Sequence, residues 1–316
     1  MDNAAATAWR SEMVADAAIG LTDQPKRLSP KWLYDTVGSA LFERITKLPE
    51  YYPTRTETAL LRSSADDLAR LVPAGGALVE LGSGASVKTR ILLDAGPHLG
   101  AYVPIDISAN FLNETAGDLR RRYPTLAVHP IVADFTRPVQ LPDATHGLPK
   151  VGFFPGSTIG NLELEAAKDL LVGVRAWNNV QAFVLGADLV KDKATLVDAY
   201  DDAQGVTARF VTNALVRLAA EPDVRIDPER FCYRASWNAD LAQIDMELVA
   251  RNAHTARIGD VEISFAAEEP IHVSASRKYT HTTLAALAKA GGWRIDTLYG
   301  AEDKLFTVAV LVPSDQ

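Results

Sequence analysis

Cysteine is almost absent from this sequence, since Cys232 is the only one among 316 residues. A single thiol excludes an intramolecular disulfide and any zinc site built from several cysteines. Long apolar runs are also missing, because no stretch approaches the roughly 18 uninterrupted apolar residues of a membrane span. The first residues have neither a basic segment nor a long apolar core, so no secretory signal is expected. These absences predict a cytoplasmic protein.

Basic side chains are scarcer than acidic ones, which gives a net charge of −8 and a pI of about 5.3. A surface of that sign does not attract phosphate backbones or anionic lipid, so we expect neither nucleic acid nor a membrane as a partner. The densest basic run, residues 120–122, is interpreted as a solvated helix face. Metal-ligand spacing is missing too, because the six histidines form no His-x-x-x-His pair, and no metal is expected.

The composition is otherwise that of a globular protein, with 47% apolar and 23% charged residues. In the middle of the chain, short apolar runs alternate with amphipathic helical patterns such as 111–121 and 164–174. Strands that are apolar throughout indicate a parallel sheet covered on both faces. The pattern therefore predicts a doubly wound, Rossmann-like α/β domain. Its expected strands are 77–81, 101–106, 126–134, 151–154 and 182–188.

The flanking segments have a different pattern. The first sixty residues form short helical patterns separated by breakers, and a helical period resumes at 57–71. After 191 a mostly helical stretch, 196–218, precedes alternating segments typical of half-exposed antiparallel strands. We expect an inserted α+β module that binds substrate. The expected alternating segments are 231–237, 244–250 and 261–265, and we expect a helix at 282–290 and a strand at 305–312 after them.

The chain is therefore expected to form two domains. The sheet domain that binds the cofactor consists of 61–195 plus 287–316, and the substrate-binding domain consists of 1–60 plus 196–286.

A glycine-rich segment, residues 80–86, lies where the first predicted strand meets the first helix. Glycines let the backbone approach a ligand there, and the helix N-terminus favours an anion. The dinucleotide fingerprint requires a third glycine, but Val87 holds that place. An acidic residue before Gly-x-Gly, here Glu80, is common in S-adenosylmethionine enzymes, in which the anion is the methionyl carboxylate.

Acidic residues end the next two predicted strands as well. Asp106 can accept hydrogen bonds from both ribose hydroxyls, Asp134 can bind the adenine amino group, and Phe135 can stack on the base. Three strand ends of matched chemistry favour an adenosyl ligand over a purely structural glycine turn. A serine nucleophile at Ser157 is not expected, because the Gly-x-Ser-x-Gly pattern is absent there.

Several blocks of this sequence resemble one family, the histidine-specific α-N-methyltransferases of ergothioneine biosynthesis. The resemblance covers about residues 29–312, and its most specific block is Phe-Phe-Pro-Gly-Ser-Thr-Ile-Gly-Asn at 153–161. It implies a class I methyltransferase sheet domain and transfer of three methyl groups from S-adenosylmethionine to the α-amine of histidine, which gives hercynine. The remaining blocks are 31–35, 38–42, 48–57, 80–84 and 186–191.

The resemblance also assigns roles by position. Asn161 and Tyr200 would bind the amine. Aromatic side chains would lie over the reacting nitrogen and the substrate carboxylate, namely Tyr34, Phe42 and Tyr51 or Tyr52. Gly156 would also belong to the substrate site. The cofactor would contact Glu80, Gly82, Ser83, Gly84, Lys88, Asp106, Asp134 and Phe135.

Two departures from the family fall in the inserted module. In the family a methionine and a glutamate hold the imidazole. Met246 matches the methionine, and Ser276, also expected at the substrate, matches the serine two residues after the glutamate, but Ser274 stands where the family has the glutamate. Residues 210–213 read Phe-Val-Thr-Asn, whereas the family usually has Phe-Asn-x-Asn. We therefore expect a monomer that acts on a free amino acid with relaxed or shifted specificity, histidine first and tryptophan or another aromatic amino acid second. The sequence also leaves open a non-catalytic binding protein on the same fold and a methyltransferase that acts on a macromolecule.

Overall fold

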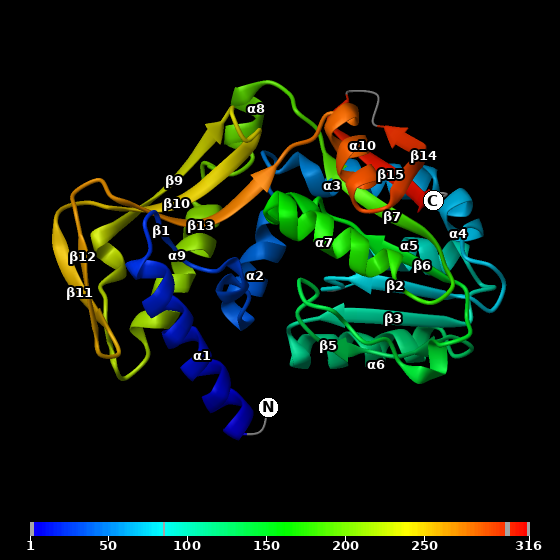
Figure 1. The fold of residues 1–316 in the computed structure, drawn as a ribbon, viewed down its shortest axis with the longest axis horizontal. Helices are drawn as coiled ribbons and strands as arrows, with labels where there is room; N and C mark the ends of the chain where they lie inside the picture. Colours follow the sequence, from blue (N-terminus) through cyan, green and yellow to red (C-terminus); the bar gives the residue numbers. More distant parts are fainter. Residues whose placement is uncertain (1–2, 85, 301–303, 315–316) are drawn as a thin grey trace. The chain divides into compact units, whose positions relative to one another are not determined.

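The computed structural model describes residues 3–84, 86–300 and 304–314 (Figure 1). The chain divides into two compact units. Unit 1 consists of Met1–Tyr52 and Lys191–Ser276, and unit 2 consists of Pro53–Val190 and Arg277–Gln316. Residues 53–60 lie in unit 2 because Glu57 hydrogen-bonds the backbone of Gly156, also in unit 2.

Unit 2 is built on one mostly parallel sheet with the strand order β14-β15-β7-β6-β2-β3-β4, and β5 also pairs with β3. Among the described strands of this sheet, β15 pairs antiparallel with both β14 and β7, and the other strand pairs are parallel. The doubly wound fold expected from the sequence is confirmed. The strands are β2 (Ala77–Leu81), β3 (Ala101–Asp106), β4 (Ala127–Val128), β5 (Ile131–Val132), β6 (Lys150–Phe154), β7 (Val180–Asp188), β14 (Trp293–Gly300) and β15 (Phe306–Pro313).

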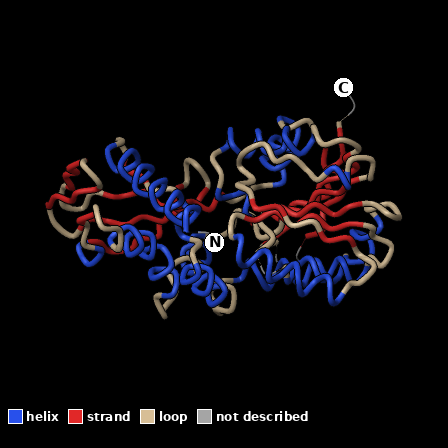
Figure 2. Tube along the Cα trace, turned by 90° about the horizontal axis from the view of Figure 1, so that it is seen from below, coloured by secondary structure: helices blue, strands red, loops and turns tan. Residues whose placement is uncertain are grey.

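Helices cover both faces of this sheet, as Figure 2 shows. The side chains of β2 alternate between two hydrophobic clusters: Val79 and Leu81 belong to one, and Leu78 belongs to the other. Because each face is covered, every residue of β2 is buried, and this is why all its residues except Glu80 are apolar. The helices are α3 (Tyr52–Ser63), α4 (Ala65–Arg70), α5 (Val87–Ala95), α6 (Ala109–Arg122), α7 (Leu164–Arg175) and α10 (His281–Ala290).

Unit 1 is an α+β module with two smaller sheets. One has the order β1-β13-β10-β9, and the other has the order β12-β11-β8. The strands are β1 (Lys26–Arg27), β8 (Val224–Arg225), β9 (Phe231–Asn238), β10 (Gln243–Ala250), β11 (His254–Ile258), β12 (Val261–Phe265) and β13 (Pro270–Arg277). The helices are α1 (Asn3–Thr22), α2 (Thr36–Ile45), α8 (Lys193–Asp198) and α9 (Val206–Ala219).

Two expectations from the sequence pattern were wrong in detail. The start of the chain is one helix of 20 residues, α1, because an alanine-rich segment with no proline before Pro25 favours helix by propensity alone. The strand expected at 126–134 is divided into β4 and β5, since Pro130 has no N–H to donate. The mostly helical stretch expected at 196–218 is confirmed, as α8 and α9, and Gly205 adopts φ = 62° between these two helices.

Candidate active site

The glycine loop at the carboxyl end of β2 has the backbone conformation that its glycines permit. Gly82 and Gly84 have φ of 67° and 47°, and Ser86 is also left-handed at the start of α5; Ala85 lies outside the described residues. A Cβ on Gly82 would lie 3.3 Å from the Phe135 ring, whereas one on Gly84 would meet no atom within 4 Å. The loop backbone therefore lies against Phe135 at Gly82 and is open at Gly84.

Acidic residues beside this loop are held by backbone N–H groups. Asp106 ends β3, and its two carboxylate oxygens accept hydrogen bonds from the amides of Gly84 and Ser108, each at 2.9 Å. Asp134 lies beyond β5 and accepts from the Thr136 amide at 2.9 Å. Because β2, β3 and β5 are neighbours in the sheet, their carboxyl ends place the loop, Asp106 and Asp134 at one edge. The Phe135 ring packs edge-on against Phe154, with a centroid distance of 5.3 Å.

Glu80, just before the loop, is turned inward. Its side chain is buried and accepts hydrogen bonds from the hydroxyls of Thr89 and Tyr102. Burial raises the pKa of Glu80 to about 8, although these two hydrogen bonds act in the opposite direction. Glu80 thus connects β2 to α5 and β3 beneath the loop, and near neutral pH it does so mainly as a protonated acid.

This buried carboxyl group predicts a pH dependence of stability. Between the ordinary pKa of 4.5 and the folded value of about 8, the folded protein keeps a proton that the unfolded chain has lost. Glu80 therefore lowers the free energy of unfolding as pH rises across this window, by up to about 1.4 kcal/mol per pH unit. Glu80→Gln, which keeps an acceptor for both hydroxyls, is expected to be more stable than the wild type at pH 8 by a margin that narrows toward pH 5.

Urea titrations of wild type and Glu80→Gln at pH 5, 6.5 and 8 measure this margin. Glu165→Gln is the matched control, because the Glu165 side chain is 81% exposed. A margin for Glu80→Gln that is the same at all three pH values would contradict the raised pKa.

Lys88 and Ser83 complete the set expected at the cofactor. Lys88, in the first turn of α5, contacts the carboxylate of Glu57. The Ser83 side chain is buried, and its hydroxyl has no hydrogen-bond partner among the described residues. Glu57 has no role in the sequence analysis, although it lies in one of the family blocks, because nothing in its local pattern reveals a partner 99 residues away.

Asn161 ends a short 3₁₀ turn, η3 (Thr158–Asn161), that follows β6. Gly156 enters this turn at φ = 87°, and Ser157 is also left-handed at φ = 56°. The Ser157 hydroxyl accepts a hydrogen bond from the Asp188 amide at 2.9 Å, which ties the turn to the end of β7. The Asn161 side chain has no hydrogen-bond partner in the part of the chain that the structure describes, so its amide is available to a ligand.

Tyr34 and Phe42, which the sequence analysis places near the substrate, form an aromatic cluster in unit 1. Their ring centroids are 5.9 Å apart, and Phe210 of α9 lies 5.4 and 5.8 Å from them. Asp35 fixes this arrangement, because it caps α2 by accepting from the Gly38 amide at 2.7 Å and also accepts from the Asn213 side chain at 2.9 Å. An aspartate followed three residues later by a helical glycine is a recognisable N-cap signal, but its link to α9 is not.

Tyr200 lies beside a second pair of expected substrate residues. Its hydroxyl is 2.7 Å from the Ser276 hydroxyl, and its ring is 5.8 Å from Tyr51 in an edge-on contact. Tyr52 has a different environment: its hydroxyl accepts from Lys191 at 2.6 Å, and the same ammonium lies 4.4 Å from its ring centroid. Of the two tyrosines left open by the sequence, Tyr51 is the one that contacts Tyr200.

Met246 and Ser274 share one face of the β1-β13-β10-β9 sheet. Tyr200 bonds Ser276 through its hydroxyl and accepts from the Tyr233 hydroxyl through its carbonyl, so Ser276 and Tyr233 point to the same side. Side chains alternate along a strand, and Met246 pairs with Ala235, two residues from Tyr233. Both Met246 and Ser274 are therefore on the Tyr200 side of the sheet, each 6% exposed.

The family relationship is decided by comparison with known proteins. The profile of a family described as "Histidine-specific methyltransferase, SAM-dependent" matches residues 13–313. A histidine N-alpha-methyltransferase of Mycolicibacterium smegmatis is 41% identical over 285 residues, which is 87% of each chain. The chain belongs to this family. It is an S-adenosylmethionine-dependent N-methyltransferase.

Other relatives of the enzyme differ in the substrates that their names state. A histidine N-alpha-methyltransferase of Mycobacterium tuberculosis is 41% identical over 287 residues, covering 89% of this chain and 88% of that protein. A 4-dimethylallyltryptophan N-methyltransferase of Claviceps purpurea is 27% identical over 294 residues, covering 82% and 83%. The comparisons thus include relatives named for histidine and for a tryptophan derivative.

The residues of unit 2 fit S-adenosylmethionine. The loop is open at Gly84, where added side-chain atoms would meet nothing within 4 Å, and the Asp106 carboxylate is fixed beside it. No group of three or more His, Cys, Asp or Glu residues within 3–84, 86–300 and 304–314 could hold a metal ion. Across the same ranges, no helix is long and apolar enough to cross a bilayer.

Proposed function

We propose that this methyltransferase acts on the α-amine of a free amino acid with a flat ring, with histidine as the leading substrate and tryptophan, tyrosine and phenylalanine as competitors. The observation that carries this proposal is Ser274, a residue only 6% exposed whose side chain has no hydrogen-bond partner among the described residues. Such a group on the Met246 face is a position for contact with a ligand. Relatives named for histidine support the leading substrate.

The chemistry requires an unprotonated amine and the exclusion of water. The methyl donor supplies an activated sulfonium methyl, so the residues mainly position the substrate. In this proposal the Asn161 amide oxygen accepts an N–H of the amine, and the Tyr200 hydroxyl hydrogen-bonds the same nitrogen. Each transfer removes an N–H and leaves a more methylated cation, and a face of Tyr34, Phe42 or Tyr51 stabilises such a cation by about 0.5–2 kcal/mol.

Ser274 sets the ring preference in this proposal. A glutamate would accept the imidazole N–H in a charge-assisted hydrogen bond, whereas serine is shorter and uncharged. Met246, with a flexible side chain that packs well against aromatic rings, accommodates either an imidazole or a larger ring. The tryptophan derivative named for the Claviceps purpurea relative supports the view that this fold accepts an indole.

Ser274→Glu tests the proposal directly. It is expected to raise the kcat/KM ratio of histidine to tryptophan by roughly 10-fold or more, because a charge-assisted hydrogen bond contributes about 1.5–3 kcal/mol. The measurement is kcat/KM for histidine, tryptophan, tyrosine and phenylalanine on both enzymes. Ser264→Glu is the control, since Ser264 is an exposed residue of β12.

Two results would contradict the proposal. If no free amino acid in the panel is methylated by the wild type, the proposed substrate class is wrong. If the wild type is active but Ser274→Glu gains nothing for histidine relative to the other rings, the role assigned to Ser274 is wrong.

A further inference from the structure

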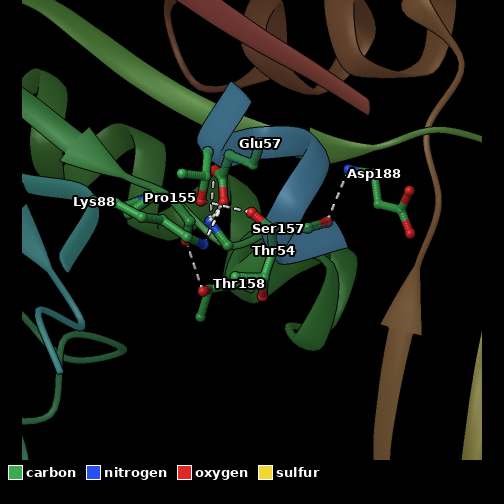
Figure 3. A network of polar contacts seen from close by, with 9 residues as sticks. Thr54, Glu57, Lys88, Pro155, Ser157, Thr158 and Asp188 are labelled. Atoms are coloured by element: carbon green, nitrogen blue, oxygen red, sulfur yellow. Dashed lines mark hydrogen bonds and ion pairs between the residues drawn. The ribbon is translucent and has the colours of Figure 1, made fainter. Parts of the chain in front are cut away.

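A buried glutamate connects two parts of the site in unit 2. Glu57 of α3 is 0% exposed, and both of its carboxylate oxygens lie 2.8 Å from the Gly156 amide nitrogen. Its carboxylate also contacts the ammonium of Lys88, which lies in the first turn of α5, after the glycine loop. Figure 3 shows Glu57 between Lys88 and the segment that contains Pro155 and Ser157. One side chain therefore binds both the start of α5 and the start of the Asn161 turn.

The backbone of β7 passes close to this carboxylate. A Cβ on Gly186 of β7 would lie 2.0 Å from a Glu57 carboxylate oxygen, so the strand passes closely only because residue 186 has no side chain. A Cβ on Gly156 would lie 3.2 Å from the Thr158 hydroxyl and 3.5 Å from the Lys88 ammonium, so this residue is also closely surrounded. Glu57 is thus confined on the side of Gly186 and bound by the Gly156 amide and Lys88.

The Asn161 turn depends on this anchor at its first residue. Gly156 and Ser157 are consecutive left-handed residues, a conformation that residues with a side chain rarely adopt. The Glu57 carboxylate holds the Gly156 amide, and the Asp188 amide holds the Ser157 hydroxyl. At the far end, a Cβ on Gly160 would lie 2.5 Å from the Arg277 carbonyl oxygen, so the turn is also confined there.

We propose that Glu57 is a positioning residue for methyl transfer: its carboxylate fixes the Gly156 backbone and thereby Asn161, and its contact with Lys88 ties this turn to the helix that follows the glycine loop. The inference rests on the proposed function, because Asn161 is a proposed contact of the amine. Glu57 acts through these neighbours and touches no reacting atom.

Glu57→Ala and Glu57→Gln separate positioning from folding. Turnover is measured per cofactor site, with the sites titrated calorimetrically by S-adenosylhomocysteine, so that misfolded protein does not count. Glu57→Ala is expected to lower kcat per site about 100-fold, because small misplacements of a positioning group have effects of that order. Glu57→Gln keeps an oxygen for the Gly156 amide and is expected to retain most of kcat, while KM for the amino acid changes less than kcat in both variants.

A second pair of variants avoids changing the carboxylate. Gly186→Ala places a methyl group against the Glu57 carboxylate and is expected to lower kcat per site in the same way. Gly173→Ala is the matched control, because Gly173 is an exposed residue of α7 where a Cβ meets nothing within 4 Å. Hydrogen exchange of residues 156–161 gives a readout that does not depend on turnover. Exchange there should accelerate in Glu57→Ala and Gly186→Ala but not in Gly173→Ala.

The outcomes are distinct. If the wild type methylates no amino acid, the proposed function fails, and the proposed role of Glu57 falls with it. If the wild type is active but kcat per site in Glu57→Ala stays near the wild-type value, or exchange of 156–161 is unchanged, only the role of Glu57 is overturned. The proposed role would also be overturned if Glu57→Ala and Gly186→Ala lost cofactor sites in proportion to their loss of total activity. The remaining sites would then be fully active, and the role of Glu57 would be structural alone.

Discussion

Replacement of Lys278 by methionine is expected to lower the free energy of unfolding by about 3–5 kcal/mol, the usual effect of removing one partner of a buried ion pair. The Lys278 ammonium lies 2.7 Å from an Asp188 carboxylate oxygen, and both side chains are 0% exposed. Methionine keeps most of the volume of lysine but removes the positive charge that lies 2.7 Å from this buried carboxylate. The penalty therefore comes from the lost charge and not from a cavity.

Urea unfolding of wild type and variants, followed by fluorescence and circular dichroism, measures this effect. Lys168→Met is the control, because the Glu165–Lys168 pair is exposed and such pairs contribute about 0–1 kcal/mol. Adding Asp188→Asn to Lys278→Met should recover part of the loss, since the charge is then gone. Equal effects of Lys278→Met and Lys168→Met would show that this pair contributes no more than a surface pair.

Asp106→Ala is expected to weaken binding of S-adenosylhomocysteine by roughly 100-fold, because hydrogen bonds to a charged group contribute about 1.5–3 kcal/mol each. The carboxylate would bind the ribose hydroxyls, and it also holds the Gly84 amide of the glycine loop. Stability without ligand should change little, because Asp106 lies at a strand end and is only partly buried.

Calorimetric titration and thermal unfolding with and without S-adenosylhomocysteine test this result. Asp118→Ala is the control, since Asp118 is an exposed residue of α6 that pairs only with Arg121 among the described residues. NAD is the control ligand and should leave the melting temperature of the wild type unchanged. An affinity of Asp106→Ala within a few-fold of the wild type would exclude Asp106 from the ribose site.

The sequence was sufficient to predict the parts of the fold that follow from burial. The residues of β2 and β6 are all buried because helices cover both faces of the sheet, and this leaves short segments of mainly apolar residues in the sequence. The glycine loop could also be predicted, since the positive φ values at Gly82 and Gly84 favour the glycines that the sequence has there. The position of Asp106 at a strand end could be predicted because it is the last residue of an apolar run.

Long-range polar contacts could not be predicted in this way. Asp35 accepts a hydrogen bond from Asn213, 178 residues away, and Glu57 binds Gly156 across 99 residues. Neither pair has a periodicity, because a single hydrogen bond fixes only two positions and imposes no pattern on their neighbours. The contact between Lys191 and Tyr52, 139 residues apart, has the same origin.

The close approach of Gly186 to Glu57 restricts the order in which the two positions can change during evolution. A side chain at residue 186 would collide with the carboxylate, at 2.0 Å from Cβ to oxygen, as long as glutamate is present. A lineage could therefore gain alanine at 186 only after residue 57 had become shorter, and the reverse order would pass through an impaired enzyme. Relatives with a side chain at the place of Gly186 are expected to have a residue shorter than glutamate at the place of Glu57.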